Sequence, residues 1–224
     1  FVNVQANAEV TLVESFYNIG SAKVFSNFVS EKFVGENAKL TCHTFQNEGA
    51  LSYSVNTNQV KINKYSNYSN TTMTLSGELV RNNHNVVLAD SNCEAHLNGL
   101  FISSGTQQID NHTLIDHQMP HCESNELYKG IAKDKSAGTF NGKIFVRKDA
   151  QKTNAYQSSK NILMSDDATI NTKPQLEIYA DDVKCSHGTS TGKIDTEALF
   201  YLKARGIGED SARKLLLQAF AQEL

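Results

Sequence analysis

Short runs of alternating apolar and polar residues dominate residues 1–194. Clear examples are Glu9–Val13, Gln59–Ile62, Thr71–Leu75 and Asn85–Leu88. Asn, Ser, Gly and Asp separate these runs, and these residue types supply turns. No apolar stripe of helical period occurs before residue 195. The pattern therefore predicts an all-β body.

A motif that begins as an apolar strand and ends in an Asp-containing corner recurs late in this body. Its copies are Ile144–Ala150, Ile162–Ala168 and Ile178–Val183, with starts 18 and then 16 residues apart. Parallel strands need long crossovers unless the chain coils as a solenoid, and no helical segment is available here. The near-constant spacing predicts the rungs of a parallel β-helix, each burying its face on the next. A run of antiparallel hairpins is the alternative at this point.

The pattern changes at Asp195, where a helical region over residues 195–224 is predicted. Asp195 is placed as the N-cap of a first helix that ends at Gly206. Glu209 and Asp210 suit the start of a second helix, where the dipole favours acids. The expected apolar stripe of that helix consists of Ala212, Leu215, Leu216, Ala219 and Phe220, with Leu217 beside it.

Composition narrows the function classes. The 224 residues are 39% hydrophobic with no apolar run long enough to span a bilayer, so no membrane role is implied. A formal charge of −3 without a basic cluster argues against nucleic-acid binding. The four cysteines show no tight spacing, which predicts free thiols and a cytoplasmic location. Because the opening residues Phe1–Val4 already read as strand, we expect the sequence to be part of a longer protein.

The usual enzyme signatures are missing. The sequence contains no Walker A loop, no GxGxxG after a strand, no HExxH and no GxSxG. These absences disfavour an enzyme.

Cys185 and His187 are the candidate metal ligands. They lie two residues apart in the segment 180–188, which reads as strand, so they are expected to share one face with Asp181 and Val183. A neighbouring imidazolium would favour the thiolate that binds metal. Two ligands do not complete a site, and a plain buried cysteine remains an open alternative on spacing alone.

Three further histidines crowd one segment but do not form a cluster of ligands. His112 and His117 fall on opposite faces of the expected strand, and His121 follows Pro120. Structural imidazoles bonded to backbone carbonyls across rungs are the favoured interpretation.

Several long motifs resemble the SufB/SufD family of iron-sulfur cluster assembly proteins, and the segment Ala180–Gly188 is most similar to the SufD branch. The resemblance is strong from residue 110 onward. Glu126 departs from the Gln common in the family, and Thr189–Gly192 varies the usual ending. The matching segments are His112–Thr113, His117, Pro120–Cys122, Ser124, Glu126–Gly130, Phe140–Ile144, Ala150–Gln157, Pro174–Ile178, Leu199–Leu202 and Arg205–Ile207.

The resemblance implies a right-handed parallel β-helix over residues 1–194 followed by a helical region over 195–224. It also implies a non-catalytic scaffold subunit that pairs with SufB through the C-terminal end of the β-helix and docks the SufC ATPase on its tail. Cys185 and His187 would then hold a transient iron-sulfur cluster or iron at the SufB interface, with no stably bound cofactor. The expected partner-binding residues of the tail are Phe200, Tyr201, Leu202, Arg205, Leu215 and Phe220.

Two other functions stay open at this point. One is a β-helical carbohydrate-active protein, although the sequence has no tryptophan and its paired aspartates alternate between faces. The other is a homomeric structural β-helix whose open edge pairs with a second copy of itself, giving a homodimer in isolation.

Overall fold

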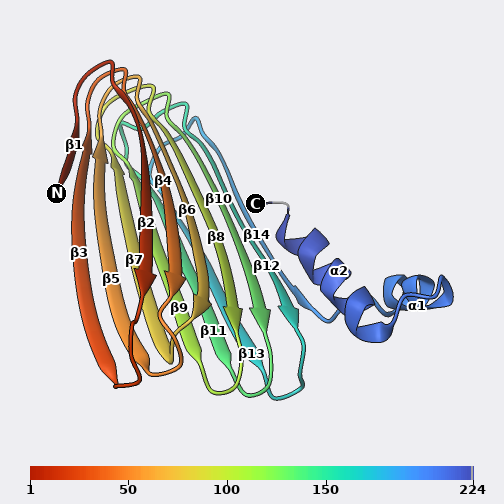
Figure 1. Ribbon diagram of the computed structural model, residues 1–224. Helices are drawn as coiled ribbons and strands as arrows, with labels where there is room; N and C mark the ends of the chain where they lie inside the picture. Colours follow the sequence, from red (N-terminus) through yellow and green to blue (C-terminus); the bar gives the residue numbers. More distant parts are fainter. Residues whose placement is uncertain (223) are drawn as a thin grey trace.

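The computed structural model describes residues 1–222 and 224, and it shows a parallel β-helix followed by two short helices (Figure 1). The β-helix is built from two seven-stranded sheets. The odd-numbered sheet contains β1 (Val2–Val4), β3 (Val24–Val34), β5 (Ser52–Ile62), β7 (Leu79–Leu88), β9 (Gln108–His117), β11 (Ala137–Val146) and β13 (Thr169–Ile178). The even-numbered sheet contains β2 (Glu9–Tyr17), β4 (Lys39–Asn47), β6 (Asn67–Ser76), β8 (Glu94–Ser103), β10 (Glu123–Ala132), β12 (Asn154–Leu163) and β14 (Lys184–Gly192).

Successive strands alternate between the two sheets, so one rung of the solenoid takes two strands. The pairings within both sheets are parallel, which confirms the predicted β-helix and excludes the antiparallel hairpins. The prediction that the sequence repeat of 16 to 18 residues is one rung is wrong. The repeat marks half a rung, because Ile144 and Ile178 lie in the odd-numbered sheet and Ile162 lies in the even-numbered one. The side chains of Asn67 and Glu94 are hydrogen-bonded between neighbouring rungs, and these residues are 27 positions apart in the sequence.

The core lies between the two sheets and is filled by alternate residues of the strands between the two end rungs. In β11 every second residue is buried, as period-two alternation requires. Large side chains occupy space that glycines leave in the neighbouring rung. Tyr128 pairs in register with Gly99 and stacks on Phe140 with ring centroids 4.4 Å apart. The interior is thus tightly packed from rung to rung.

The corners that lead into the even-numbered strands repeat one backbone conformation. In six of these corners, the residue two positions before the strand has a positive φ between 54° and 63°. Asparagine tolerates this left-handed region better than most residues, which explains part of the asparagine content. The six residues are Asn7, Asn37, Tyr65, Asn92, His121 and Lys152.

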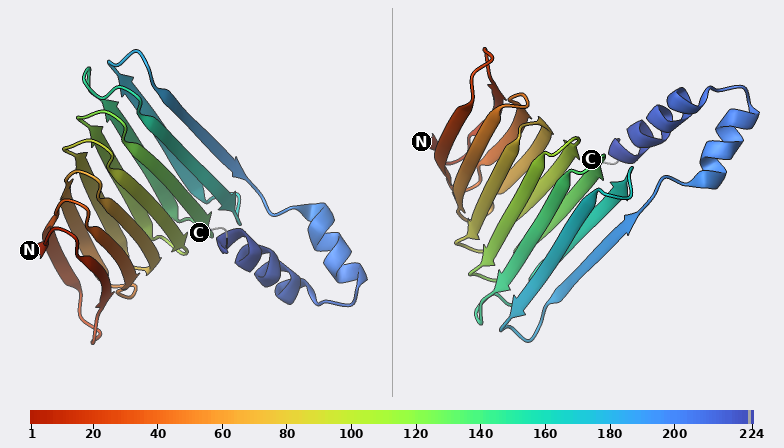
Figure 2. Two further views of the ribbon diagram at one scale, coloured as in Figure 1. Left: turned by 90° about the horizontal axis from the view of Figure 1, so that it is seen from above. Right: turned by 90° about the horizontal axis from the view of Figure 1, so that it is seen from below.

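The two predicted helices are confirmed as α1 (Thr196–Ala204) and α2 (Glu209–Ala221). The Asp195 side chain accepts hydrogen bonds from the backbone N–H groups of Glu197 and Ala198, at 2.8 and 3.1 Å. Gly206, with a φ of 84°, follows the C-terminal end of α1. Figure 2 shows that the helical hairpin extends beyond the ends of the strands and that α2 returns toward the β-helix.

The apolar stripe of α2 differs from the expected one. Leu216 and Leu217 pack with the buried Ala212, whereas Leu215 is 47% exposed. This stripe is rotated because α2 packs on α1 and also on Ile162 and the neighbouring end of β12. Within the described residues, none of the helices has the length and apolar character needed to cross a membrane.

Candidate functional site at the open end of the β-helix

The final rung of the β-helix is uncovered on one side. β14 pairs with β12 and stands last in the even-numbered sheet, and β13 pairs with β11 and stands last in the odd-numbered sheet. Within the described residues no further strand continues either sheet, as Figure 2 shows. Both strands therefore present unpaired edges, which favour pairing with another chain.

Cys185 and His187 both lie on β14 and share its inward face. Cys185 is in register with Ala155, and His187 is in register with Gln157. Because Ala155 and Gln157 are both buried in the interior, the residues stacked on them continue the same inward column. The predicted shared face is therefore found, and it is found at the open rung.

The strand begins later than the sequence predicted. β14 starts at Lys184, so Asp181 lies in the corner before the strand rather than on its alternating face. Val183 also precedes the strand, and it packs against the same apolar cluster as Cys185.

The environments of the two candidate ligands are different. Cys185 is half-buried against an apolar cluster, and this burial raises the pKa of its thiol. The expected thiolate is therefore not favoured in this chain, because desolvation penalises the charged form. His187 is exposed. The apolar cluster consists of Ile144, Val146, Ala150, Ala155 and Ala180.

The described residues do not complete Cys185 and His187 into a metal site. Among the described residues, no group of three or more His, Cys, Asp or Glu side chains is arranged to hold a metal ion. The two side chains can supply one sulfur and one nitrogen, which is half of a tetrahedral set. Any further ligands would have to come from outside the described part of the chain.

Two polar residues lie beneath the open rung, and the local sequence pattern did not reveal them. Gln157 on β12 donates a hydrogen bond from Nε2 to the carboxylate of Glu126 on β10. Glu126 is fully buried, and burial raises its pKa to about 7, against the smaller lowering by the Thr113 hydroxyl and the Gln157 amide. Glu126 and Gln157 are 31 residues apart, so only the spacing of whole rungs would have brought them together.

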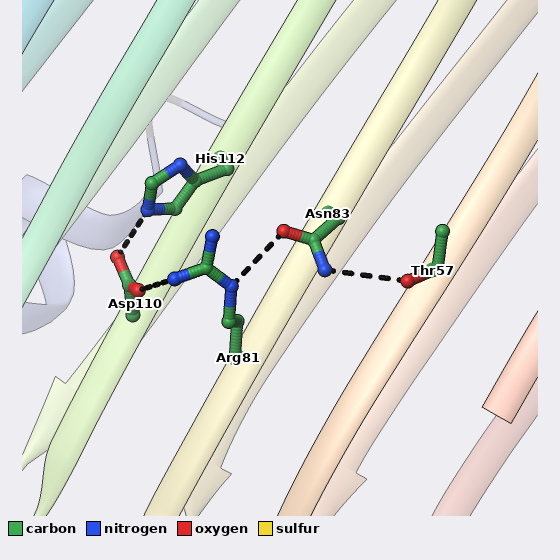
Figure 3. Close-up of polar contacts among 5 residues, drawn as sticks. All are labelled: Thr57, Arg81, Asn83, Asp110 and His112. Atoms are coloured by element: carbon green, nitrogen blue, oxygen red, sulfur yellow. Dashed lines mark hydrogen bonds and ion pairs between the residues drawn. The ribbon is translucent and has the colours of Figure 1, made fainter. Parts of the chain in front are cut away.

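His112 belongs to a polar ladder on the outer face of the odd-numbered sheet (Figure 3). His112 Nε2 lies 2.8 Å from Asp110 Oδ1, and Arg81 Nη1 lies 2.7 Å from Asp110 Oδ2. The ladder continues from Arg81 Nε to Asn83 Oδ1 at 3.1 Å and from Asn83 Nδ2 to Thr57 Oγ1 at 3.2 Å. The arrangement ties three rungs together, which is a structural role.

The remaining histidines also have structural surroundings. His117 is buried with its Nε2 2.9 Å from Ser124 Oγ, and His84 Nε2 is 2.9 Å from Tyr68 Oη. His121 occupies one of the left-handed corners. For His112 and His117, the expected bonds from imidazoles to backbone carbonyls are therefore replaced by bonds to side chains.

Cys93 and Cys122 stack in adjacent corners, where their thiols satisfy backbone carbonyls. Their sulfur atoms lie 3.0 and 3.2 Å from the carbonyl oxygen of Asp90. Thr153 makes the same kind of contact one rung further on, where its Oγ1 donates to the Ala150 carbonyl at 2.9 Å. All four cysteines of the chain are free, as predicted.

The helical tail forms an apolar groove of about 790 Å³ between α1 and α2. Phe200 and Tyr201 line this groove and are 73% and 57% exposed. Leu202 lines it as well but is half-buried in the contact between the helices. The guanidinium of Arg205 lies 5.0 Å from the Tyr201 ring centre.

Phe220 sits apart from the exposed groove residues, against the β-helix. Lys129 Nζ donates to the Phe220 carbonyl at 2.5 Å and lies 4.6 Å from the ring centre. A cation at the C-terminal end of α2 is favourable for the helix dipole. Of the six expected partner-binding residues, Phe220 therefore anchors the tail, while Leu215 is exposed.

Fold and site together define a β-helical protein with an open terminal rung and a helical hairpin tail. The family model described as "SUF system FeS cluster assembly, SufBD core domain" matches residues 1–220. The chain belongs to this SufBD family.

Relatives from several organisms agree with the family match. The chain is 36% identical to a SufBD family protein of Synechocystis and 35% identical to the iron-sulfur cluster assembly protein SufD of Escherichia coli. It is 33% identical to the chloroplastic protein ABCI7 of Arabidopsis thaliana. All of the chain is covered in these three matches, against 51%, 53% and 48% of the relatives. The chain thus spans about half the length of the curated relatives it matches.

Proposed function

We propose that this chain is the core of a scaffold subunit for iron-sulfur cluster assembly, of the SufD type. In this role it does not turn over a substrate. It pairs with SufB, docks the SufC ATPase and lends two side chains to a cluster that is cargo rather than a resident cofactor. Its family and its similarity to SufD support the cluster-assembly role.

The observation that carries the proposal is the position of His187 on the inward face of an uncovered rung. An imidazole stacked on a buried column, yet left exposed, becomes enclosed as soon as another subunit continues the β-helix. Cys185 on the same face would supply a sulfur ligand once a metal ion displaces its proton. The half-set of ligands is therefore explained by a site shared between two chains.

The unpaired edges of β13 and β14 support pairing with SufB. Two β-helices that meet at their open ends can satisfy the backbone groups of both edges through strand addition. This pairing would bury the inward-facing residues of β14 and exclude water from the cluster. The homomeric β-helix remains the competing arrangement, and it would use the same edges.

The groove between α1 and α2 supports the docking of the ATPase. Phe200 and Tyr201 expose large aromatic side chains to solvent. Aromatic residues are enriched at protein–protein interfaces. We propose that Phe200, Tyr201 and Arg205 contact the ATPase and that Phe220 keeps the tail on the β-helix. The proposed location is the cytoplasm, where the four thiols remain reduced.

The cluster role is tested by His187→Ala in the complex with SufB and SufC. We expect cluster loading, measured by visible absorbance and iron content, to fall at least tenfold while the complex still forms. Ser186→Ala, on the outward face of the same strand, is the matched control and should leave loading unchanged. Normal loading by the His187→Ala complex would disprove the ligand role.

The docking role is tested by Phe200→Ser. We expect the affinity for SufC, measured by calorimetry, to fall at least tenfold because an exposed aromatic anchor is lost. Gln218→Ser, on the exposed side of α2, should bind SufC normally. If the Phe200→Ser chain bound SufC as tightly as the parent, the groove would not be the docking surface.

A further inference from the structure

Two buried side-chain oxygens of β12, the strand beneath the open rung, lack a hydrogen-bond partner among the described residues: Gln157 Oε1 and Asn161 Oδ1. Gln157 is 3% exposed, and its Nε2 donates to the Glu126 carboxylate. Its Oε1 is buried and has no partner among the described residues. Leaving a buried acceptor unsatisfied costs about 1 to 3 kcal/mol. A native interior tolerates such an atom where it serves a function or acquires a partner.

The surroundings of Gln157 leave the final rung as the side from which this oxygen can gain a partner. Glu126 lies one rung below and holds the nitrogen end of the amide, so the oxygen end of the same planar group is turned away from Glu126. Gly142 gives the amide its space, since a Cβ at that position would lie 2.2 Å from Gln157 Nε2. The residue in register above Gln157 is His187.

Adjacent strands lie about 4.8 Å apart, which is within reach of a hydrogen bond between stacked side chains. His187 carries a ring N–H, and Gln157 Oε1 is an acceptor without a partner among the described residues. A neutral imidazole has one nitrogen that donates and one that accepts. If one ring nitrogen of His187 donates to Gln157 in the rung below, the other ring nitrogen presents its lone pair away from the interior.

We propose that Gln157 is a positioning residue for His187, whose ring N–H it accepts at Oε1. The bond fixes one tautomer and one ring orientation, and it leaves the second ring nitrogen free to bind metal at the open edge. Metal-binding histidines commonly have their other N–H fixed in this way. The structure shows Gln157 Oε1 without a partner in the described part of the chain and His187 exposed, so the proposal requires the His187 ring to turn inward onto this oxygen. The inference rests on the proposed function for the meaning of the free nitrogen, while the inward turn of the ring needs only residues of this chain.

The proposal also explains why Glu126 is buried directly below. A carboxyl group that accepts from Gln157 Nε2 prevents the amide from turning over, and so it keeps the oxygen end toward His187. Ala155, two residues before Gln157 on the same inward face, shows that an apolar side chain is accommodated there without such a network. The site is therefore built over three successive strands of the even-numbered sheet, β10, β12 and β14.

Long-range ¹H–¹⁵N correlation spectra of the 224-residue chain, labelled at histidine, test the bond. His187 is assigned by loss of its signals in His187→Gln. We expect His187 to populate one tautomer in the parent chain and a mixture of both in Gln157→Met, which keeps the side-chain length and removes the acceptor. Ser159→Ala changes the same inward face two residues further along and should leave the tautomer unchanged.

Gln157→Glu is the second variant, because it restores an oxygen acceptor and should restore the single tautomer. A parent chain in which His187 already averages both tautomers would overturn the proposal, whether or not Gln157→Met folds. An unchanged tautomer in a folded Gln157→Met chain would overturn it as well.

The loaded complex provides a separate measurement. Gln157→Met should lower cluster loading about tenfold, in the range found when partners of metal-binding histidines are removed, and Gln157→Glu should recover most of it. If His187→Ala leaves loading unchanged, the proposed function fails while the tautomer result stands. If Gln157→Met loads normally although His187→Ala does not, the positioning role fails and the proposed function stands.

Discussion

At the scale of single residues, the buried carboxyl group of Glu126 makes stability depend on pH. Its pKa in the folded chain is raised to about 7 by burial, from the ordinary 4.5. The protonated form is the one that the fold favours, so its stabilising contribution is complete below pH 4.5 and is lost as the pH rises through 7.

Glu126→Gln removes this dependence while keeping an acceptor for Gln157. We expect the variant to be about 1 to 3 kcal/mol more stable than the parent at pH 8 and nearly equal at pH 4.5, because each unit of pKa corresponds to about 1.4 kcal/mol. Urea unfolding at both pH values measures the difference. Glu31→Gln, at an exposed position of β3, should show no such change between the two pH values. Equal stabilities of Glu126→Gln and parent at pH 8 would contradict the expectation.

Gly99 is a second residue whose role can be measured. A Cβ there would lie 2.3 Å from Cε1 of Tyr128, whose ring is buried and stacked on Phe140. Gly99→Ala should therefore destabilise the chain by about 1 to 3 kcal/mol, the usual cost of overpacking. Gly188→Ala is the control, because a Cβ at that position has no neighbour within 4 Å. The midpoint of thermal unfolding should fall for the first variant and stay for the second.

Some residues of the site could be connected from the local sequence, and others could not. Cys185 and His187 could be placed on one face because strand alternation is a local property. Gln157 and Glu126 could not be connected to them, since the connection depends on the register between rungs. Spacing alone could not show either that Cys185 packs in an apolar cluster, where burial raises its pKa.

At the scale of elements, α1 depends on its N-cap. The Asp195 carboxylate accepts from two backbone N–H groups that have no partner within the helix. Asp195→Ala should destabilise the first turn by about 1 kcal/mol. Hydrogen exchange at Glu197 and Ala198 should accelerate about fivefold, whereas Asp195→Asn, which keeps an acceptor, should exchange nearly as slowly as the parent.

The two helices also show which elements a sequence specifies locally. α1 was placed correctly because its cap and its terminal glycine are neighbours of the helix itself. The predicted apolar stripe of α2 is wrong at Leu215. The buried face of α2 depends on its contacts with α1 and with the end of β12, and the periodicity of α2 carries no information about these contacts.

At the scale of the whole molecule, the open rung should control association. Thr189→Asp places a carboxylate on the inward face of β14, where a partner that continues the β-helix would bury it without a counter-charge. Burying an unpaired charge costs several kcal/mol. We therefore expect at least a tenfold loss of affinity for SufB, and of any self-association, measured by sedimentation velocity. Ser186→Asp on the outward face should associate like the parent, and equal affinities of the two variants would contradict the interface.

The architecture as a whole was predictable, but the length of its rung was not. Apolar strands ending in Asp-containing corners recur every 16 to 18 residues, and nothing local distinguishes a full rung from half of one. Only the pairing of β11 with β13 and of β12 with β14 shows that alternate copies of the motif belong to the same sheet.

The repeated left-handed corners have a consequence for how such proteins can change over evolution. Because the same backbone turn recurs two residues before six of the even-numbered strands, each rung is an interchangeable module. Adding or removing one complete module would leave the inward-facing residues of the other rungs stacked in register. A shorter insertion within a strand would shift the register of the residues that follow it in that strand. Length variation among homologues should therefore occur in whole modules or within corners, and the terminal rung, with its exposed histidine, should keep its sequence whatever the number of modules before it.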